Sequence, residues 1–298
     1  MSYRMRTYIA LALDPIHVGA GGYRLGRVDN TIIREPGTNL PKIPGTSFSG
    51  AVRSYAAMRL NDGRCAGTTG CGENTCPICY TFGSTPMEGE PETKKSYQGT
   101  VRFSDGQVVL FPVHSMLGPV WLTTAGLLKE TFGIEDATPP DDETLRTTLD
   151  TTGVGNRLNL SWLLLSTGER LSLSSQNALW IGLPQDIRGR LAVASPKLFS
   201  QVVNTNLEVR TSVAINPATG AAEEKKLFTY EALPRTTIVA FEVVEYDYRR
   251  AFPSQARVTT PLDIVEQGLS YLEILGIGGM GTRGFGRLKI LARNERRE

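Results

Sequence analysis

The sequence predicts an α+β sheet fold of the ferredoxin-like kind, and three observations support this prediction. Several segments alternate polar and apolar residues, as half-buried strands do. Apolar residues recur at helical spacing in other segments, and Gly, Pro and Asn residues that favour turns separate the segments. The resulting order is strand, helix, strands, helix, strand.

The first elements are a strand, a long loop and a helix. Residues 4–13 alternate polar and apolar side chains, which is typical of a strand. Residues 28–34 form a second extended piece after a glycine-rich loop. A helix with apolar residues at helical spacing then runs to about Leu60, and the hydroxyl of Thr46 or Ser47 is expected to cap its first turn.

Later segments predict the rest of the sheet and its helices. Strands are expected at residues 100–103, 107–113, 120–123, 237–246 and 287–292. Helices are expected near residues 124–130, 141–149 and 261–275. Residues 205–235 are expected to form a long hairpin, because alternating segments flank the turn sequence 216–220. We interpret residues 1–298 as one domain with a discontinuous core, into which this hairpin and a cysteine-rich segment at residues 62–98 are inserted.

Composition and charge exclude several classes of protein. Apolar residues make up 40% and charged residues 21% of the 298 positions, which is ordinary for a globular protein. The net charge of +2 is too balanced for a histone-like polycation. The longest apolar stretches fall far short of the ~18 residues of a membrane helix, and no signal peptide precedes the first strand. We therefore expect a cytoplasmic protein without a membrane partner.

Basic residues gather at the two ends of the chain. Residues 1–60 hold eight basic against three acidic residues, and residues 281–298 hold six against two. Residues 130–150 compensate with seven acidic residues. If the two ends meet, they form a basic face suited to a polyanion. The alternative is that the charges scatter over a solvated surface.

The four cysteines form the sharpest motif. Cys65, Cys71, Cys76 and Cys79 are separated by five, four and two residues, with glycines and a proline that permit tight turns. Four thiolates on so short a segment can converge on one tetrahedral ion, which favours structural zinc without an open catalytic position. An iron–sulfur cluster and unligated or redox-active thiols remain as alternatives.

The glycine-rich segment at residues 276–286 and the two histidines are less specific. The glycines permit close backbone approach to an anion, but the segment leads into a strand and lacks the P-loop motif. Phosphate or nucleic-acid contact and a merely tight turn remain open. His17 and His114 are the only histidines, and no hydrolase triad motif accompanies them.

The following motifs occur in order along the chain: His17-Val-Gly-Ala-Gly, Val28-Asp29-Asn30, Ile33-Arg34-Glu35-Pro36, the segment 40–47, Gly50 with Arg53, and the segment 276–286. Together they resemble the RAMP superfamily of CRISPR systems, and most closely the repeated backbone subunit of type III RNA-targeting complexes. The segments 101–105, 110–113 and 227–231 resemble the Cmr branch. The terminal glycine loop and Val28-Asp29-Asn30 are more similar to the Csm branch.

The resemblance implies a modified ferredoxin-like fold, similar to an RNA-recognition motif, with insertions. It implies a subunit that stacks in copies along a guide RNA, wedges a hairpin thumb between guide and target, and cuts target RNA at regular intervals. The implied partners are guide RNA, target RNA, further copies of the chain, and other subunits that include a large polymerase-like subunit and small helical subunits. The expected products carry 2′,3′-cyclic phosphate and 5′-hydroxyl ends.

The resemblance also assigns roles to individual residues. Asp29 matches the cleavage aspartate, which holds catalytic Mg²⁺ or Mn²⁺ or positions the attacking hydroxyl. The expected RNA-binding residues are His17, Gly19, Gly21, Gly22, Arg34, Lys42, Ser47, Ser49, Gly50, Arg53, Gly278, Gly279, Met280, Gly281 and Arg283. Ser49 stands where relatives usually carry a lysine, so it can bond a phosphate but brings no charge.

Two other functions remain open beside the metal-dependent endoribonuclease. The chain is alternatively a structural guide-binding scaffold without cutting activity, in which Asp29 only caps a turn with Asn30. A third interpretation is a guide-processing ribonuclease of the same superfamily that uses His17 or His114.

Overall fold

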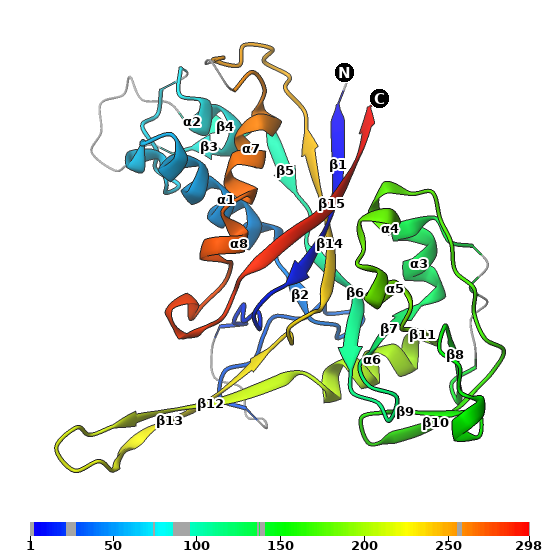
Figure 1. The fold of residues 1–298 in the computed structure, drawn as a ribbon. Helices are drawn as coiled ribbons and strands as arrows, with labels where there is room; N and C mark the ends of the chain where they lie inside the picture. Colours follow the sequence, from blue (N-terminus) through cyan, green and yellow to red (C-terminus); the bar gives the residue numbers. More distant parts are fainter. Residues whose placement is uncertain are drawn as a thin grey trace.

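The computed structural model describes residues 3–21, 28–73, 75–85, 96–135, 137, 141–254 and 258–297, leaving aside the side chains of residues 223–226. It is a mixed α and β molecule built around one large sheet (Figure 1). The strands of this sheet are β1 (Arg4–Ala12), β2 (Lys42–Ile43), β5 (Val101–Phe103), β6 (Gly106–Val113), β7 (Val120–Thr124), β8 (Thr144–Thr147), β9 (Arg157–Leu160), β10 (Leu163–Thr167), β11 (Leu191–Ala194), β14 (Ile238–Glu245) and β15 (Leu288–Arg297). Their order is β15-β1-β14-β6-β7-β11-β8-β10-β9, with β2 beside β6 and β5 beside β14.

Two small sheets and the helices complete the fold. The small sheets pair β3 (Gly83–Ser84) with β4 (Tyr97–Gln98), and β12 (Glu208–Ile215) with β13 (Ala222–Ala232). The α-helices are α1 (Gly45–Arg59), α2 (Pro77–Phe82), α3 (Ala125–Phe132), α4 (Ala178–Gly182), α5 (Gln185–Arg188), α6 (Pro196–Thr205), α7 (Pro261–Leu269) and α8 (Leu272–Leu275). The 3₁₀ helices are η1 (Gly63–Cys65), η2 (Thr152–Val154) and η3 (Gly281–Arg283). In the described part of the chain, none of the helices has the length and apolar character needed to cross a membrane.

The strands β15, β1, β14 and β6 form the first half of the large sheet, and each pairs antiparallel with its neighbour. Because β1 pairs with β15, the two ends of the chain lie side by side at the top of Figure 1. Helices α1 and α7 pack together over one face of this half-sheet. The Phe48 ring of α1 stacks on Phe241 of β14 at a centroid distance of 4.2 Å, and Tyr8 of β1 stacks on Phe241 at 5.1 Å.

Helix α1 begins earlier than the sequence predicts. Its first residue is Gly45, so Thr46 and Ser47 lie inside the first turn and their side chains do not cap it. The expected hydroxyl cap was therefore wrong. The Asp105 carboxylate accepts a hydrogen bond from the Gly45 amide at 2.8 Å instead. A side chain at Gly45 would begin 2.5 Å from the Phe103 carbonyl oxygen, so only glycine allows this helix to start against β5.

The second half of the sheet, β7, β11, β8, β10 and β9, forms a second lobe with α3 to α6 (Figure 1). The helix expected at residues 141–149 is not formed. Thr144–Thr147 is instead the strand β8, which pairs with β10 and β11 and buries Leu145 and Thr147 on one side. These partners lie about 20 and 45 residues further along the chain, so local spacing does not reveal them.

Two other expected elements differ in the structure. The helix expected at residues 261–275 is divided into α7 and α8, with Ser270 and Tyr271 between them. The extended piece at residues 28–34 is not a regular strand, because it makes only single bridges to Gly19, Pro41 and Tyr230. Those bridges place it between the first glycine loop and the β12–β13 hairpin.

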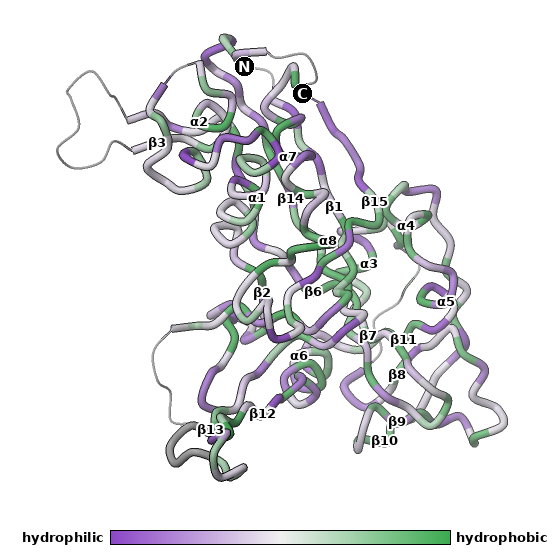
Figure 2. Tube along the Cα trace, turned by 60° about the vertical axis from the view of Figure 1, so that its left-hand side comes forward, coloured by the Kyte–Doolittle hydropathy of each residue, from purple (hydrophilic) through white to green (hydrophobic). Residues whose placement is uncertain are grey.

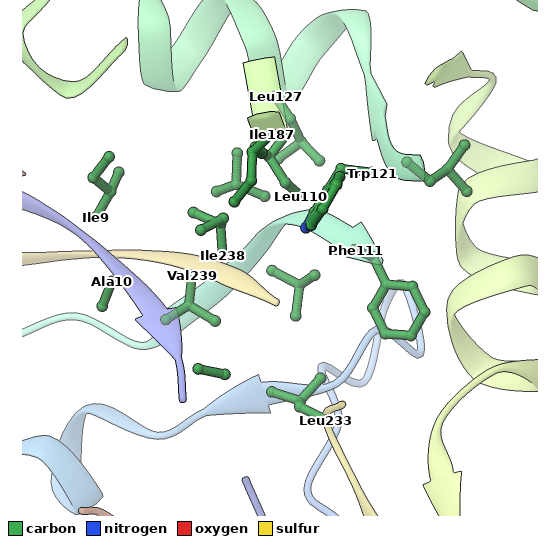
Figure 3. Packing of buried hydrophobic residues seen from close by; sticks show 14 of the residues in the cluster. Ile9, Ala10, Leu110, Phe111, Trp121, Leu127, Ile187, Leu233, Ile238 and Val239 are labelled. Carbon is green, nitrogen blue, oxygen red and sulfur yellow. The ribbon is translucent and has the colours of Figure 1, made fainter. Parts of the chain in front are cut away.

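One continuous hydrophobic core joins the two lobes. Figure 3 shows Ile9 of β1 and Ile238 of β14 on one side of this core and Trp121 of β7 and Leu127 of α3 on the other. In Figure 2 the central strands are largely hydrophobic, whereas the end of β15 near the C-terminus is hydrophilic. The β12–β13 hairpin projects away from this core at the lower left of Figure 1.

Candidate RNA interface and metal centre

The two glycine-rich loops meet in the folded chain. The Gly279 amide donates to the His17 carbonyl oxygen at 2.9 Å. Gly278 has φ +85°, and a side chain there would begin 2.4 Å from the same oxygen. Both the positive φ and the close approach require glycine. The loops that the sequence singled out separately therefore form one surface with backbone exposed at Gly19, Gly278 and Gly279.

His17 joins this surface to the base of the β12–β13 hairpin. Its side chain is only 7% exposed, and Nδ1 donates to the Glu231 carbonyl oxygen at 2.6 Å. A carbonyl can only accept, so the proton is on Nδ1. The imidazole also meets the Tyr230 ring edge to face at a centroid distance of 5.9 Å.

Glu231 fixes the segment 28–34 against the hairpin. Its carboxylate accepts hydrogen bonds from the Ile32 amide at 3.2 Å and from Arg34 at 2.6 Å. The backbone extends this contact, because Asn30 donates to the Thr229 carbonyl and Glu231 donates to the Asn30 carbonyl, both at 3.0 Å. Residues 28–34 therefore form a fixed edge beside β13.

Asp29 is exposed and bonded to the hairpin. Its Oδ2 accepts hydrogen bonds from both the amide and the hydroxyl of Thr229 at 2.8 Å, and its own amide donates to the Thr229 hydroxyl at 2.9 Å. The hydrogen bonds from Thr229, first from its backbone and then from its side chain, lower the pKa of Asp29 below its ordinary value. Asp29 is therefore a carboxylate at neutral pH, held beside the loop surface of His17.

Among the predicted cations near this surface, Arg283 is exposed. Arg283 is the last residue of η3, the 3₁₀ helix that follows Met280, whose φ of 62° is left-handed. Its guanidinium donates a hydrogen bond to the Tyr230 hydroxyl at 3.2 Å. Arg34 belongs to the same group of residues, but its guanidinium is held by Glu231, Asn204 and the Ile32 carbonyl. Arg34 is thus an internal partner of the hairpin.

Lys42 and Arg53 are engaged elsewhere. Lys42 lies between the carboxylates of Glu35 and Asp105, each 2.7 Å from its ammonium, and the hydrogen bond to Asp105 followed by that to Glu35 raises its pKa. These three residues line a cavity of about 670 Å³ on the sheet. Arg53 is only 6% exposed and donates to the carbonyls of Cys65 and Gly83. Both positions argue against the predicted RNA contacts, because the charges are already paired or buried.

The remaining predicted residues fall into three groups. Gly21 and Gly281 are exposed in the two glycine loops. Ser47, Ser49 and Gly50 lie in the first two turns of α1, and no hydrogen bond within the described ranges joins them to the Asp29 group. Gly22 lies outside the described residues.

The basic ends of the chain meet, and several of their cations in the described ranges are paired with carboxylates. Pairing of β1 with β15 brings the two ends together. Five cations of the described ends are paired as follows: Arg4 with Glu245, Arg6 with Glu266 and Glu295, Arg287 with Asp14, Lys289 with Glu273, and Arg293 with Glu266. The charge count therefore overstates the positive surface that phosphates can reach.

The four cysteines converge on one point. Their Sγ atoms all lie within 4.8 Å of one another, and the separations include 3.5 Å between Cys65 and Cys76 and 3.7 Å between Cys71 and Cys79. A disulfide would need about 2.0 Å, whereas sulfurs around a tetrahedral Zn²⁺ lie about 3.8 Å apart. All four thiols are free. The described residues can thus hold one metal ion here.

The surroundings of the cysteines shift the pKa values of individual thiols in opposite directions. Hydrogen bonding from Cys76, followed by backbone amides of Gly72 and Cys71, lowers the pKa of Cys79 to about 5 despite burial. Burial raises the pKa of Cys65 to about 12, so a metal ion bound here would have to displace the proton of this thiol. Cys76 also caps α2, because its sulfur accepts a hydrogen bond from the Cys79 amide.

Three functional candidates on the hairpin escaped the sequence analysis as individual residues. Thr229, Tyr230 and Glu231 contact Asp29, Arg283 and Arg34 respectively. The sequence analysis singles out their segment only as part of the expected hairpin at residues 205–235 and through the family resemblance of residues 227–231. Alternation along β13 was the available signal, since it places Thr229 and Glu231 on one face.

The arrangement can carry out phosphate chemistry on an extended polyanion. Exposed glycine backbone and Arg283 can contact phosphates, and the anionic Asp29 lies in the neighbouring segment that bonds the hairpin and the loop after His17. The cysteine cluster, with four protein ligands, leaves no open position for catalysis.

Comparison with known proteins places this geometry in a family. The model of the RAMP superfamily matches residues 10–289. The CRISPR system Cmr endoribonuclease Cmr4 of Pyrococcus furiosus is 24% identical over 310 aligned positions, which cover 96% of this chain and 95% of that protein. The endoribonuclease Csm3 of Methanothermobacter thermautotrophicus is 41% identical over 71 residues, covering 23% of this chain and 28% of that protein.

Solved structures agree in fold. Chains of the type III-B Cmr-beta complex superpose with TM-scores of 0.66 in the apo state and 0.65 in the state bound to cognate target RNA. The identities are 17% and 15%, and each comparison covers 96% of both chains. Since the family model spans nearly the whole sequence, this chain belongs to the RAMP superfamily.

Proposed function

We propose that this chain is the repeated backbone subunit of a type III CRISPR ribonucleoprotein, closest to the Cmr branch, which binds guide RNA and cleaves complementary target RNA at regular intervals. Membership of the RAMP superfamily and the similarity to two proteins named as CRISPR endoribonucleases support this function. Its partners are guide RNA, target RNA, further copies of itself, a large polymerase-like subunit and small helical subunits. The four free thiols agree with a reducing, cytoplasmic location.

The observation that carries the proposal is the position of Asp29. The carboxylate is exposed, anionic and fixed to the hairpin by Thr229, and it lies in the segment whose residues Thr31 and Ile33 bond the loop after His17. The proposed reaction is attack by the target's own 2′-oxygen on the adjacent phosphorus. The bond from phosphorus to the 5′-oxygen breaks, and the proton lost from the 2′-hydroxyl is balanced by one gained at the 5′-oxygen. The products are a 2′,3′-cyclic phosphate and a 5′-hydroxyl.

The residues present fit a catalytic divalent ion only in part. Asp29 supplies one carboxylate, and the cysteine cluster is the one group of three or more ligands found among the described residues. Mg²⁺ is often held by one or two carboxylates together with waters and substrate phosphates, so Asp29 can hold Mg²⁺ or Mn²⁺ once RNA is bound. Such an ion neutralises charge that develops on the phosphate. This chain's own residues hold the target in line and keep the carboxylate beside it.

We infer a ferredoxin-like core from the topology. The strands β1, β6, β14 and β15 lie in the order β15-β1-β14-β6, and a helix follows both β1 and β14. This is the arrangement of a split βαβ sheet. The second lobe, the cysteine segment and the hairpin are then insertions into that core.

The hairpin β12–β13 is suited to the role of the thumb. It projects from the body, and its cross-strand pair Val213 and Leu227 is 42% and 61% exposed. Apolar side chains that separate stacked bases act as wedges in nucleic-acid complexes. Asp29 contacts the same strand two residues from Leu227, so a nucleotide displaced by the wedge lies beside the carboxylate.

We propose a smaller set of RNA-binding residues than the sequence predicts. We retain Gly19, Gly21, Gly278, Gly279, Met280, Gly281 and Arg283 as direct contacts, because they lie on the joined loop surface. His17 and Arg34 are proposed to act indirectly, because both bond Glu231 and so hold the first glycine loop and the segment 28–34 against the hairpin. Ser47, Ser49 and Gly50 remain proposed guide contacts along α1, whereas Lys42 and Arg53 act inside the fold.

We propose that the cysteine cluster binds structural zinc. The sulfur separations and the four free thiols support this assignment. The ion would replace the core that this short segment cannot build. Elemental analysis of protein purified without chelators should give one zinc per chain, and clearly less than one would contradict the proposal.

The test of the function is Asp29→Asn in the assembled complex with guide RNA. Asn keeps the shape but removes the charge, so regular target cutting should fall at least about 100-fold, while assembly and target binding remain. Asp150→Asn is the matched control, because Asp150 accepts the same pair of hydrogen bonds from Thr152 in the second lobe. Unchanged cutting by the Asp29 variant would favour the scaffold function, with the cleavage activity in another subunit.

The guide-processing alternative finds less support. Nδ1 of His17 is committed to the Glu231 carbonyl, and His114 lies at the end of β6 beside the β9–β10 turn. Loss of precursor cleavage without loss of target cleavage in His17→Ala or His114→Ala would restore this alternative.

A further inference from the structure

We propose that Thr229 is a positioning residue that ties the Asp29 carboxylate to the β12–β13 hairpin, so that placing the hairpin on RNA also places the carboxylate. This inference rests on the proposed function. It concerns how the candidate catalytic group is held, and it assigns a role to a residue 200 positions away from Asp29 along the chain.

The contact between the two residues is reciprocal. Thr229 donates twice to Asp29 Oδ2, from its amide and from its hydroxyl, and its hydroxyl oxygen accepts from the Asp29 amide. Two donors fix the position of Oδ2 and the rotation of the carboxylate. Within the part of the chain that the structure describes, Oδ1 accepts no hydrogen bond, so this oxygen is the one available to the reacting nucleotide or to its bound ion.

The contact differs from an ordinary turn cap. In a turn cap the aspartate would bond amides one to three residues further along its own loop, as Asp150 does with Thr152. Asp29 instead bonds a strand of the hairpin. The backbone bonds between Asn30 and the Thr229–Glu231 segment keep the two chains in register.

Thr229 lies on the same strand as Leu227, which together with Val213 forms the apolar pair proposed to act as a wedge between bases. Leu227 lies two residues before Thr229, so both side chains point to the same face of β13. Val213 lies opposite Leu227 on β12. A force that moves the wedge therefore moves the donors of Asp29 in the same direction. Cleavage is then coupled to correct seating of the hairpin between guide and target.

The experiment compares Thr229→Val with Thr229→Ser in the complete complex with guide RNA. Valine keeps the shape and the amide but removes the hydroxyl, whereas serine keeps both donors. We expect the single-turnover cleavage rate of the valine variant to fall by roughly 10- to 100-fold, because small misplacements of catalytic groups cost this much. The serine variant should cut close to the wild-type rate, and both should bind target with wild-type affinity.

A matched control comes from the other side of the molecule. The amide and hydroxyl of Thr259 both donate to Asp263 Oδ2 at 2.9 Å, which repeats the Thr229 contact at the start of α7. Thr259→Val should leave the cleavage rate of the assembled complex unchanged. Equal losses in Thr229→Val and Thr259→Val would overturn the inference, since they would indicate a general effect of losing such a contact.

The pH dependence gives a second readout. Because the Thr229 donors lower the pKa of Asp29, their partial removal moves this pKa upward toward its ordinary value. Activity that requires the carboxylate is lost as pH falls through this pKa, so the acid limb of Thr229→Val should move to higher pH. If Thr229→Val does not assemble, Thr229→Ala removes the same hydroxyl in a smaller side chain.

Failure of this inference and failure of the proposed function give different results. Wild-type rate and pH profile in Thr229→Val, together with lost cutting in Asp29→Asn, would overturn only the role of Thr229. Wild-type cutting in Asp29→Asn would overturn the catalytic assignment itself and with it this inference.

Discussion

Gly70 lies at the centre of the cysteine segment, where two separate constraints require glycine. Its φ is +50°, and a side chain would begin 2.5 Å from the Cys79 sulfur and 2.9 Å from Nη2 of Arg53. Any larger residue must push a ligand or the guanidinium aside. Gly67, three residues earlier, has no atom within 4 Å of the position that a methyl group would take. A substitution at Gly67 is therefore the control for the same substitution at Gly70.

Gly70→Ala should therefore weaken zinc retention by at least about tenfold, as disturbance of groups around metal ligands commonly does. Gly67→Ala should retain zinc like the wild type. The measurement is the zinc content of each chain after titration with a competing chelator. Equal retention by both variants would contradict the prediction that a side chain at Gly70 displaces the Cys79 sulfur from the ion.

Arg53 provides a second prediction at the residue scale. Its guanidinium donates to the Cys65 and Gly83 carbonyls, and Nη2 is buried without a hydrogen-bond partner in the described structure. Arg53→Met would leave two buried carbonyl groups without their hydrogen-bond donor and should lower the free energy of unfolding by at least about 2 kcal/mol. Arg59→Met, on the exposed last turn of the same helix, is the control and should change it little. Chemical denaturation of zinc-loaded protein measures both.

The cysteine segment and Arg53 show how much of the structure can be predicted from the sequence at this scale. The cysteine spacing was sufficient to predict a cluster, because all four ligands lie within fifteen residues. The role of Arg53 was not predictable, since burial depends on helix rotation and on the Gly83 carbonyl thirty residues away. The Asp29 and Thr229 contact spans 200 residues, so no local pattern contains it.

At the scale of elements, α1 and α7 cross at a glycine. A side chain at Gly268 of α7 would begin 2.2 Å from the Val52 carbonyl oxygen and 2.6 Å from its Cγ1. Gly→Ala usually stabilises a helix, but here the helices would have to separate. Gly268→Ala should therefore lower the free energy of unfolding by about 1–3 kcal/mol.

Gly50 of α1 is the control for Gly268, because an alanine there changes helix propensity without changing the contact between α1 and α7. Nothing lies within 4 Å of its missing side chain, so Gly50→Ala should raise the free energy of unfolding by about 0.5–1 kcal/mol through helix propensity. Thermal denaturation compares the two variants. Destabilisation of similar size in both would show that the close crossing of α1 and α7 does not decide the result.

Elements were predictable where their pattern is local. The strands β1, β6 and β14, helix α1 and the hairpin follow the expected positions because alternation or helical spacing is complete within each segment. Strand β8 was mistaken for a helix, because its partners β10 and β11 decide its conformation. The long helix expected at residues 261–275 is divided in the structure, since Ser270 and Tyr271 separate α7 from α8.

At the scale of the whole molecule, the two chain ends are held together by strand pairing and by ion pairs. Arg6 of β1 donates to Glu295 of β15 at 2.8 Å and to Glu266 of α7 at 3.0 Å. Charge counting predicted that the ends would gather positive charge, and it missed these acidic partners. The partners are distant in sequence, so only the folded sheet reveals how much of the charge is neutralised.

These ion pairs predict the response of the molecule to acid. Hydrogen bonds from Arg6, and then from Arg297, lower the pKa of Glu295 below its ordinary value. A carboxylate with a lowered pKa stabilises the folded state above its unfolded pKa of about 4.3, and this contribution is lost as pH falls through the lowered folded value. Glu295→Gln cannot ionise, so it lacks the contribution at every pH.

The variant should therefore unfold roughly 2 °C below the wild type at pH 7, which corresponds to about 0.5–1 kcal/mol for a partly exposed pair screened by solvent. The difference should shrink as the pH falls below about 4, because the wild-type carboxyl then takes up its proton. Melting temperatures of both chains from pH 7 to about pH 3.5 make the comparison. A gap that stays constant or widens in acid would mean that Glu295 contributes through packing, and that the closure of the two ends does not depend on its charge.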